Sequence, residues 1–286
     1  MIQLYNKLEA VVFDWAGTTV DYGCLAPLNA FIDIFKEKNI VVTNEEVRGP
    51  MGMGKWDHIY ELCQLESVKA QWKARYKKWP SKDEIDELYQ EFEPTLFANL
   101  KFYAKPIEGT LEVVDALRKN GLKIGSTSGY TKEMLDIVAE EAAKQGYQPD
   151  IRITSEKFSK GRPFPYMCYE NAIQLDINGM QKMVKVGDTV ADIQEGIHAG
   201  MWSVGVVLGS SLHGFSEMDI KHMSQAELSK SMEVAKMKFY QAGAHFVINS
   251  IKELPRLIEE INDVLQQNIY PHEYSHRKRL EHGKLL

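Results

Sequence analysis

Asp14 follows directly after the apolar run of residues 11–13, near the beginning of a chain of 286 residues. A β-branched and aromatic run of this kind predicts a buried strand in a parallel sheet, and ligands of such sheets lie beyond the carboxyl ends of the strands. Gly17 allows a ligand to approach the backbone closely, and Thr18 adds a hydroxyl and an amide of the kind that hold phosphate. We therefore expect Asp14 to be presented at a phosphate-holding site, although an aspartate in this place often only caps the next helix.

Two further predicted strands end in polar residues in the same way. Ser128 lies at the end of a predicted strand over residues 122–129, and Asp188 follows one over 183–187, with Asp192 four positions later. Hydroxyl groups bond phosphoryl oxygens, and carboxylates are the hard oxygen ligands that Mg²⁺ prefers. Two interpretations of Asp192 stay open: it orients water or supports Asp188, or it caps the helix that follows.

Lys55 stands near the start of a predicted helix, after a turn rich in glycine and proline at residues 48–54. The partial positive charge at a helix N-terminus lowers the tendency of a lysine to stay protonated there. A neutral lysine amine condenses with an aldehyde to an iminium ion, which draws electrons from the neighbouring carbon. His58 and Met51 would share a helix face with Lys55 if the turn at Gly52 is already helical. Alternatively, Lys55 is a surface lysine, and His58 only forms a hydrogen bond among the helices.

Helical periodicity dominates residues 25–100, whereas strands and helices alternate after Gly109. Predicted strands lie at 11–13, 122–129, 151–154, 183–187, 202–207 and 245–248, and predicted helices at 110–120, 132–145, after 165 and at 253–267. This alternation is typical of an α/β fold with a doubly wound parallel sheet. We predict a Rossmann-like core at 1–22 and 100–269, an inserted α-helical cap domain at 23–99 with hinges at Gly23 and 103–106, and a basic, solvated tail at 270–286.

The composition is that of a folded, moderately acidic protein, with 44% hydrophobic and 26% charged residues and a net charge of -6. Nucleic acid is an unsuitable partner, because phosphate backbones are bound by clustered Lys and Arg. The three cysteines form neither a disulfide framework nor a zinc pattern, which fits a reducing cytoplasm. No segment has the roughly 20 apolar residues that span a bilayer, and the first ten residues lack the apolar core of a signal peptide. We therefore expect a cytoplasmic protein without a membrane partner.

In chain order, Asp14, Ser128 and Asp188 resemble the successive motifs of the haloacid dehalogenase superfamily. The resemblance implies that Asp14 attacks phosphorus, and that Asp14, the backbone carbonyl of Ala16 and Asp188 hold Mg²⁺. Phosphatases of the superfamily carry a second aspartate at position 16 to protonate the departing alcohol, whereas an alanine can move no proton. The superfamily's usual basic residue is best matched by Arg162, in a loop restricted by flanking Gly and Pro; a loop arginine is otherwise usually solvated.

The combination of Ala16 with Lys55 resembles more narrowly the phosphonoacetaldehyde hydrolase family, the branch that cleaves phosphorus–carbon bonds. This resemblance implies that Lys55 forms a Schiff base with the aldehyde of a small phosphonate substrate, so that carbon leaves phosphorus as an enamine and no acid at position 16 is needed. It also implies a homodimer formed through the cap and supporting roles around the aldehyde for Cys24, Met51, His58 and Tyr130. Cys24, Met51 and Tyr130 are open to the alternative that they only pack. Ser128 stands where the family often has Thr, and the tail after Tyr270 is outside the pattern.

Two rival functions stay open. A magnesium-dependent phosphate-ester phosphatase or mutase on the same scaffold would turn over a generic aryl phosphate and would be indifferent to the loss of Lys55. A catalytically inactive regulator that binds an aldehyde or a phosphate is the second rival, and the retained Asp14 and Asp188 disfavour it.

Overall fold

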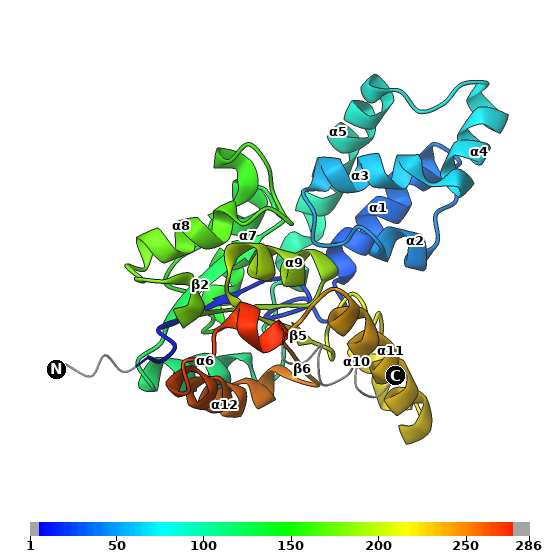
Figure 1. Cartoon of the computed structure of the whole chain (residues 1–286). Coiled ribbons are helices and arrows are strands. Elements are labelled where there is room, and N and C mark those ends of the chain that lie inside the picture. Colours follow the sequence, from blue (N-terminus) through cyan, green and yellow to red (C-terminus); the bar gives the residue numbers. More distant parts are fainter. Residues whose placement is uncertain (1–5, 277–286) are drawn as a thin grey trace.

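The computed structural model describes residues 6–276, so that the predicted tail residues 277–286 lie outside the described range. A six-stranded, entirely parallel sheet forms its centre, in the order β3-β2-β1-β4-β5-β6 (Figure 1). The strands are β1 (Ala10–Phe13), β2 (Lys123–Ser128), β3 (Ile153–Thr154), β4 (Met183–Gly187), β5 (Trp202–Val206) and β6 (Phe246–Ile248). The predicted α/β fold is confirmed.

The register of β1 determines which side chains meet at the edge of the sheet. Phe13, its last residue, lies opposite Ser126 of β2 and Val186 of β4. The next residue stays in the ladder, because the Asp14 amide donates to the Val186 carbonyl at 2.9 Å. Since parallel strands end at a common edge, the side chains that follow β1, β2 and β4 converge there.

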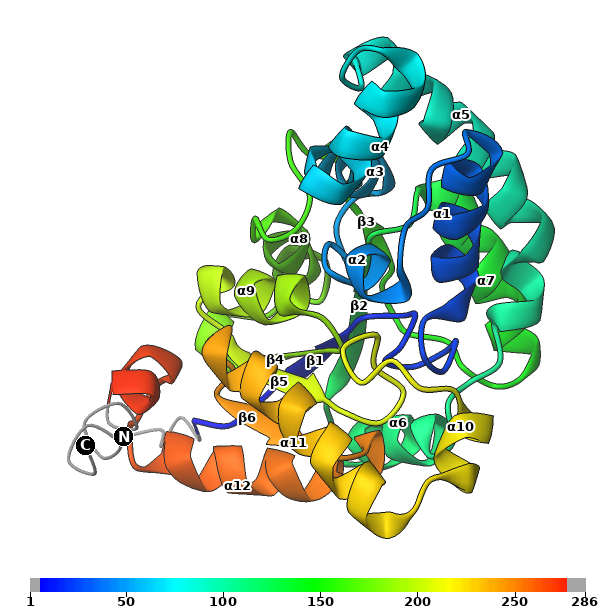
Figure 2. The same ribbon diagram turned by 90° about the vertical axis from the view of Figure 1, so that its right-hand side faces the viewer.

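Helices cover both faces of the sheet (Figures 1 and 2). They are α6 (Thr110–Lys119), α7 (Lys132–Lys144), α8 (Tyr166–Gln174), α9 (Val190–Ala199), α10 (Glu217–His222), α11 (Gln225–Gln241) and α12 (Leu254–Gln266). Because strand side chains alternate, Val11 and Phe13 pack in one buried cluster with Leu117 of α6, whereas Val12 packs on the opposite face with Cys168 of α8. The core is therefore doubly wound, as predicted.

The helices of residues 23–99, called the cap below, stand together on one side of the sheet (Figures 1 and 2). They are α1 (Leu25–Glu37), α2 (Asn44–Arg48), α3 (Lys55–Gln64), α4 (Glu66–Tyr76) and α5 (Lys82–Asn99). The chain segments that enter and leave this group lie side by side, because Val20 forms an antiparallel bridge with Pro106. The Asp21 carboxylate accepts from the Leu25 and Ala26 amides and so satisfies the first donors of α1.

Residues 270–276 are folded onto the core rather than solvated. The Tyr274 ring centroid lies 5.4 Å from that of Trp202 and 5.0 Å from that of Phe246, and Pro271 is buried. The prediction of a solvated tail is therefore wrong for these residues.

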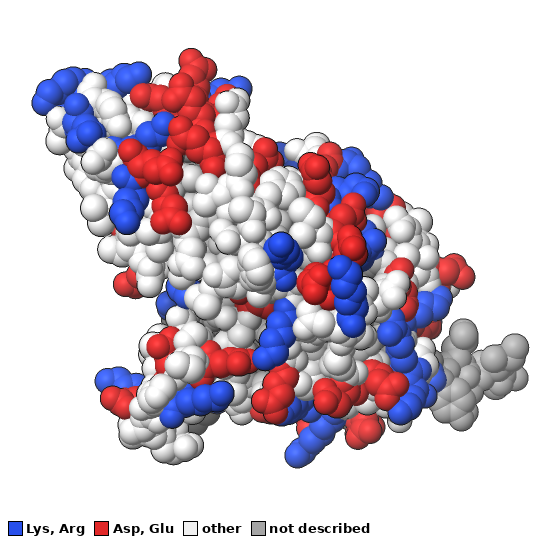
Figure 3. Space-filling view, turned by 180° about the vertical axis from the view of Figure 1, so that it is seen from behind, with Lys and Arg blue, Asp and Glu red and all other residues white. Residues whose placement is uncertain are grey.

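The surface carries charges of both signs. On the face seen in Figure 3, Lys and Arg alternate with Asp and Glu, and the described residues there form no continuous basic stripe of the kind that binds nucleic acid. None of the described helices combines the length and the apolar character that a bilayer crossing requires.

Candidate active site

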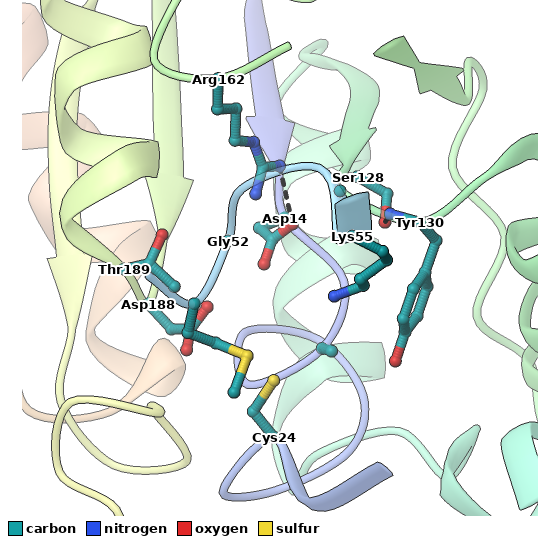
Figure 4. Close-up of a pocket in the computed structure, with 12 residues that line it drawn as sticks. Asp14, Cys24, Gly52, Lys55, Ser128, Tyr130, Arg162, Asp188 and Thr189 are labelled. Atoms are coloured by element: carbon teal, nitrogen blue, oxygen red, sulfur yellow. Dashed lines mark hydrogen bonds and ion pairs between the residues drawn. The ribbon is translucent and has the colours of Figure 1, made fainter. Parts of the chain in front are cut away.

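A small pocket lies between the edge of the sheet and the cap (Figure 4). Its wall combines residues from the ends of β1, β2 and β4 with residues of the cap and of the loop before α8: Asp14, Ala16, Cys24, Met51, Gly52, Lys55, Ser128, Gly129, Tyr130, Arg162, Asp188 and Thr189. Of the residues predicted for the site, Thr18, His58 and Asp192 are buried behind this wall, and the others line it.

Arg162 reaches the carboxylate at the end of β1. Its Nη2 lies 2.7 Å from Asp14 Oδ1, and its side chain is only 1% exposed, so the interpretation as a solvated loop residue is wrong. The same guanidinium pairs with Asp192 at 2.9 Å and with Glu195 at 3.0 Å. Burial alone would lower the pKa of Arg162, but the three carboxylates raise it well above its ordinary value. The pocket therefore has a permanent planar cation beside Asp14.

Three carboxylates form a cluster suited to a hard cation. Candidate ligand oxygens of Asp14, Asp188 and Asp192 lie within 4.8 Å of one another. Burial, and then the charges of Asp14 and Asp192, raise the pKa of Asp188 well above its ordinary value. A Cβ on Gly17 would lie 2.7 Å from Asp188 Cγ, and the φ of Gly17 is +86°. Glycine is therefore required in the turn after β1, where the backbone contacts the Asp188 carboxylate. Thr18 lies behind the wall of the pocket, and its Oγ1 is 3.5 Å from Asp188 Oδ1.

Asp192 caps the helix that follows it, which is one of the two interpretations that the sequence leaves open. It forms a capping box with Thr189 at the start of α9, in which each side chain accepts from the other's amide. Its Oδ1 lies 2.7 Å from Lys185 Nζ as well as near Arg162. Protein donors therefore occupy both carboxylate oxygens of Asp192, and its role in orienting water or supporting Asp188 stays a prediction.

Lys185 and Glu195 belong to the site although neither was predicted, and Thr127, next to Ser128 at the end of β2, joins them through polar contacts rather than packing alone. Lys185 is fully buried within β4 and pairs with Glu195 Oε2 at 3.3 Å. Thr127 Oγ1 accepts from Arg162 at 2.7 Å and from Lys185 at 2.9 Å and donates to Glu195 at 3.1 Å. The available signal was a lysine in the middle of an otherwise apolar strand, which has to find buried anions.

Lys55 is the first residue of α3, and its amine points into the pocket (Figure 4). The side chain is 6% exposed, so the interpretation as a surface lysine is wrong. Nζ lies 4.9 Å from the ring centroid of Tyr130 and 5.8 Å from that of Phe31. Burial among these rings lowers the pKa of Lys55 below its ordinary value, and the neutral amine is therefore more populated than in a solvated lysine.

The turn before α3 is not helical, which corrects the expectation of one shared helix face. Gly52 has φ +91°, so Met51 reaches the pocket from a loop. This loop is seated closely on the core, because a Cβ on Gly129 would lie 2.7 Å from the Met53 carbonyl oxygen. The loop geometry thus places Lys55 and Met51 beside the strand ends.

His58 lies one turn along α3 from Lys55 and does not line the pocket. Its Nε2 donates to the Val47 carbonyl at 2.8 Å, which leaves Nδ1 as an acceptor without a hydrogen-bond partner among the described residues. Burial, and then the charge of Lys55, lower the pKa of His58 well below its ordinary value. The imidazole is therefore neutral, with a defined tautomer.

The remaining predicted residues complete the wall. Burial, and then Asp21 and Asp188, raise the pKa of the Cys24 thiol well above its ordinary value, so it stays protonated. Burial likewise raises the pKa of the Tyr130 phenol. Ser128 Oγ accepts from the Tyr130 amide at 3.1 Å, which turns this hydroxyl group toward the pocket edge (Figure 4).

Comparison with known proteins gives concordant results. Residues 8–200 match the family model of haloacid dehalogenase-like hydrolases. The chain is 51% identical over 255 residues to the phosphonoacetaldehyde hydrolase of Bacillus cytotoxicus, which covers 89% of this chain and 97% of the relative. It is 51% identical over 273 residues to a bifunctional phosphonoacetaldehyde hydrolase/aminoethylphosphonate transaminase of Clostridioides difficile, and this match covers 95% of the chain but 43% of that relative. A solved phosphonoacetaldehyde hydrolase-like protein of Oleispira antarctica superposes with a TM-score of 0.91 at 34% identity, over 93% of this chain and 97% of that one.

Proposed function

The chain belongs to the phosphonoacetaldehyde hydrolases, within the haloacid dehalogenase-like hydrolases, and on this premise we propose that it hydrolyses phosphonoacetaldehyde to acetaldehyde and phosphate. The observation that carries the proposal is one pocket that joins a buried amine to a buried carboxylate, Lys55 and Asp14, with Ala16 where a phosphatase needs an acid. The amine can react with the aldehyde carbon of the substrate, and the carboxylate can attack its phosphorus.

In the first step, the neutral Nζ of Lys55 adds to the aldehyde carbon. Loss of water then gives a protonated imine, and the lowered pKa of Lys55 supports this step because only the neutral amine is a nucleophile. His58, one turn further along α3, stays neutral behind the wall of the pocket, in part because of the Lys55 charge that lowers its pKa. Tyr130 and Phe31 keep the imine in an aromatic environment that excludes water.

In the second step, a carboxylate oxygen of Asp14 attacks phosphorus. The phosphorus–carbon bond breaks, its electron pair forms the enamine, and the phosphoryl group stays on Asp14. Arg162 holds Oδ1 of Asp14, so we assign the attack to Oδ2, and the guanidinium and Ser128 hold phosphoryl oxygens. Protonation of the enamine and hydrolysis of the imine release acetaldehyde, and a second water releases phosphate.

The site fits a divalent cation by its charge. Four buried carboxyl groups outnumber two buried cations, Asp14, Asp188, Asp192 and Glu195 against Arg162 and Lys185. Burial and this crowding of carboxyl groups raise the pKa of Asp188. We propose that Asp14, Asp188 and the backbone carbonyl of Ala16 hold Mg²⁺. The ion would neutralise the phosphoryl oxygens during attack.

We propose that residues 23–99 act as a lid on the core at 1–22 and 100–269, since Lys55 comes from the lid and Asp14 from the core. We also propose a homodimer formed through the cap, which exposes the apolar side chains of Val41, Tyr60 and Trp79. A cytoplasmic location is supported by three cysteines that are all buried and free.

The test compares two substrates and two variants. We expect equal amounts of acetaldehyde and phosphate from phosphonoacetaldehyde, and little phosphate from p-nitrophenyl phosphate. Lys55→Arg keeps the charge but cannot form an imine and should abolish turnover of the phosphonate, whereas Lys38→Arg, which alters a cap lysine paired with Glu91, should not. Preferential turnover of the aryl phosphate, unaffected by Lys55→Arg, would instead establish a phosphate-ester phosphatase.

A further inference from the structure

Arg48, the last residue of α2, connects the cap to the core through its guanidinium. Nη1 donates to the Gly23 carbonyl at 2.9 Å and to the Ser211 carbonyl at 3.1 Å, and Nη2 donates to the Gly214 carbonyl at 3.1 Å. These acceptors come from the hinge and from a core loop. The planar fork of an arginine can satisfy several carbonyls in a fixed geometry, which a flexible ammonium cannot.

The core loop in question, residues 207–214, follows β5 and reaches Asp188. The Ser211 amide donates to Asp188 Oδ2 at 2.8 Å. The same loop accepts from the hinge, since the Gly23 amide donates to the Gly209 carbonyl at 2.7 Å. The carbonyl and the amide of Ser211 thus connect Arg48 on one side with a proposed Mg²⁺ ligand on the other.

The backbone of Arg48 is connected to the turn that carries Lys55. The Met51 amide donates to the Arg48 carbonyl at 3.2 Å, which fixes the start of the turn that precedes α3. His58 Nε2 holds the neighbouring Val47 carbonyl from α3 itself. A shift of Arg48 would therefore be passed to the helix that presents the amine.

We propose that Arg48 is a positioning residue that couples the two halves of the site, holding Asp188 through Ser211 and Lys55 through the turn before α3. This inference rests on the proposed function, because it assigns Arg48 a task in the same reaction. When the cap lies on the core, the guanidinium of Arg48 would fix the position of the Lys55 amine relative to Asp188.

The experiment uses Arg48→Lys, which keeps the positive charge but loses the fork, so that altered Mg²⁺ binding reports geometry rather than charge. Two quantities are measured on the full-length protein: Mg²⁺ affinity by calorimetry without substrate, and kcat and KM for phosphonoacetaldehyde at saturating Mg²⁺. We expect Mg²⁺ affinity to fall about tenfold and kcat to fall more than KM rises, because charge-assisted hydrogen bonds to carbonyls are lost. Arg48→Gln, measured in parallel, should also lower kcat. This second variant shows whether the effect of Arg48→Lys comes only from a folding defect of that one protein. Lys38→Ala, in the same cap, is the matched control and should change neither quantity.

The outcomes separate the inference from the proposed function. Unchanged Mg²⁺ affinity in Arg48→Lys would overturn the coupling to Asp188 even if turnover falls. A rise in KM with unchanged kcat would overturn the role in presenting Lys55. A native protein that binds Mg²⁺ without turning over phosphonoacetaldehyde would refute the proposed function, while the calorimetric comparison would still decide the role of Arg48.

Discussion

Gly52→Ala should displace the Lys55 amine while it leaves the side chain of Lys55 unchanged, and so tests how far activity depends on the position of this amine. A Cβ at position 52 would lie 3.0 Å from both Cβ and Cγ2 of Thr189 and closer still to its hydroxyl. Thr189 cannot yield, because its hydroxyl donates to Asp192 at 2.5 Å and accepts from the Asp192 amide at 3.1 Å. Since carbon atoms pack at about 3.5–4.0 Å, the turn that carries Lys55 has to move by about 0.5–1 Å.

The magnitude follows from this displacement. A misplacement of about 1 Å costs on the order of 100-fold in rate, so kcat/KM for phosphonoacetaldehyde should fall by about that factor. The φ of +91° adds strain of about 1–2 kcal/mol for alanine and acts in the same direction. The assay is phosphate release at saturating Mg²⁺, with circular dichroism to establish that the variant is folded.

Gly54→Ala is the matched control, two residues further along the same turn. A Cβ there would approach only the end of the Asp57 side chain, at 3.2 Å, and the φ of Gly54 is −56°. We expect kcat/KM to stay within roughly threefold of the native value. A Gly52→Ala protein with native kcat/KM, or equal losses in both variants, would refute the view that close seating of the turn positions Lys55.

Three further predictions concern charge. Arg162→Met leaves Asp14 and its two neighbouring carboxylates without their shared cation, and urea denaturation should show a loss of about 3–5 kcal/mol; unchanged stability would contradict the buried network. The pKa of Lys55 is lowered, so kcat/KM should rise with pH as the amine loses its proton and level off below the ordinary value of 10.5, and a pH profile that falls over this range would argue against a neutral amine. Removal of divalent cations with EDTA should stop phosphate release until Mg²⁺ is restored, and full activity in EDTA would exclude the proposed role of Asp188.

Much of the fold was predictable because its strands are short apolar runs that end in polar residues. The strand predicted at 183–187 coincides with β4, and that at 245–248 differs from β6 by one residue. Helices α10 and α11 had no predicted counterpart. In α11 only Ala235 and Phe239 are buried, so an apolar stripe that would reveal a helix is almost absent.

The site was predictable where a residue's place follows from the sheet alone. Asp14 and Asp188 end neighbouring strands, and their meeting follows from parallel pairing. The burial of Lys55 depends on how the cap sits on the core, which no periodicity within the chain encodes. The same reason hides Arg48, whose partner Ser211 is 163 residues away in sequence.

The central claim is a covalent bond between Lys55 and the substrate, and borohydride reduction tests it most directly. The protein is incubated with phosphonoacetaldehyde, reduced, digested and mapped by mass spectrometry, with Asp14→Ala as a variant in which the imine should persist with phosphorus attached. We predict a reduced adduct on Lys55 in both proteins, and in Asp14→Ala this adduct should still carry the phosphonate group. An adduct on a different lysine, or phosphate release without any adduct, would contradict it.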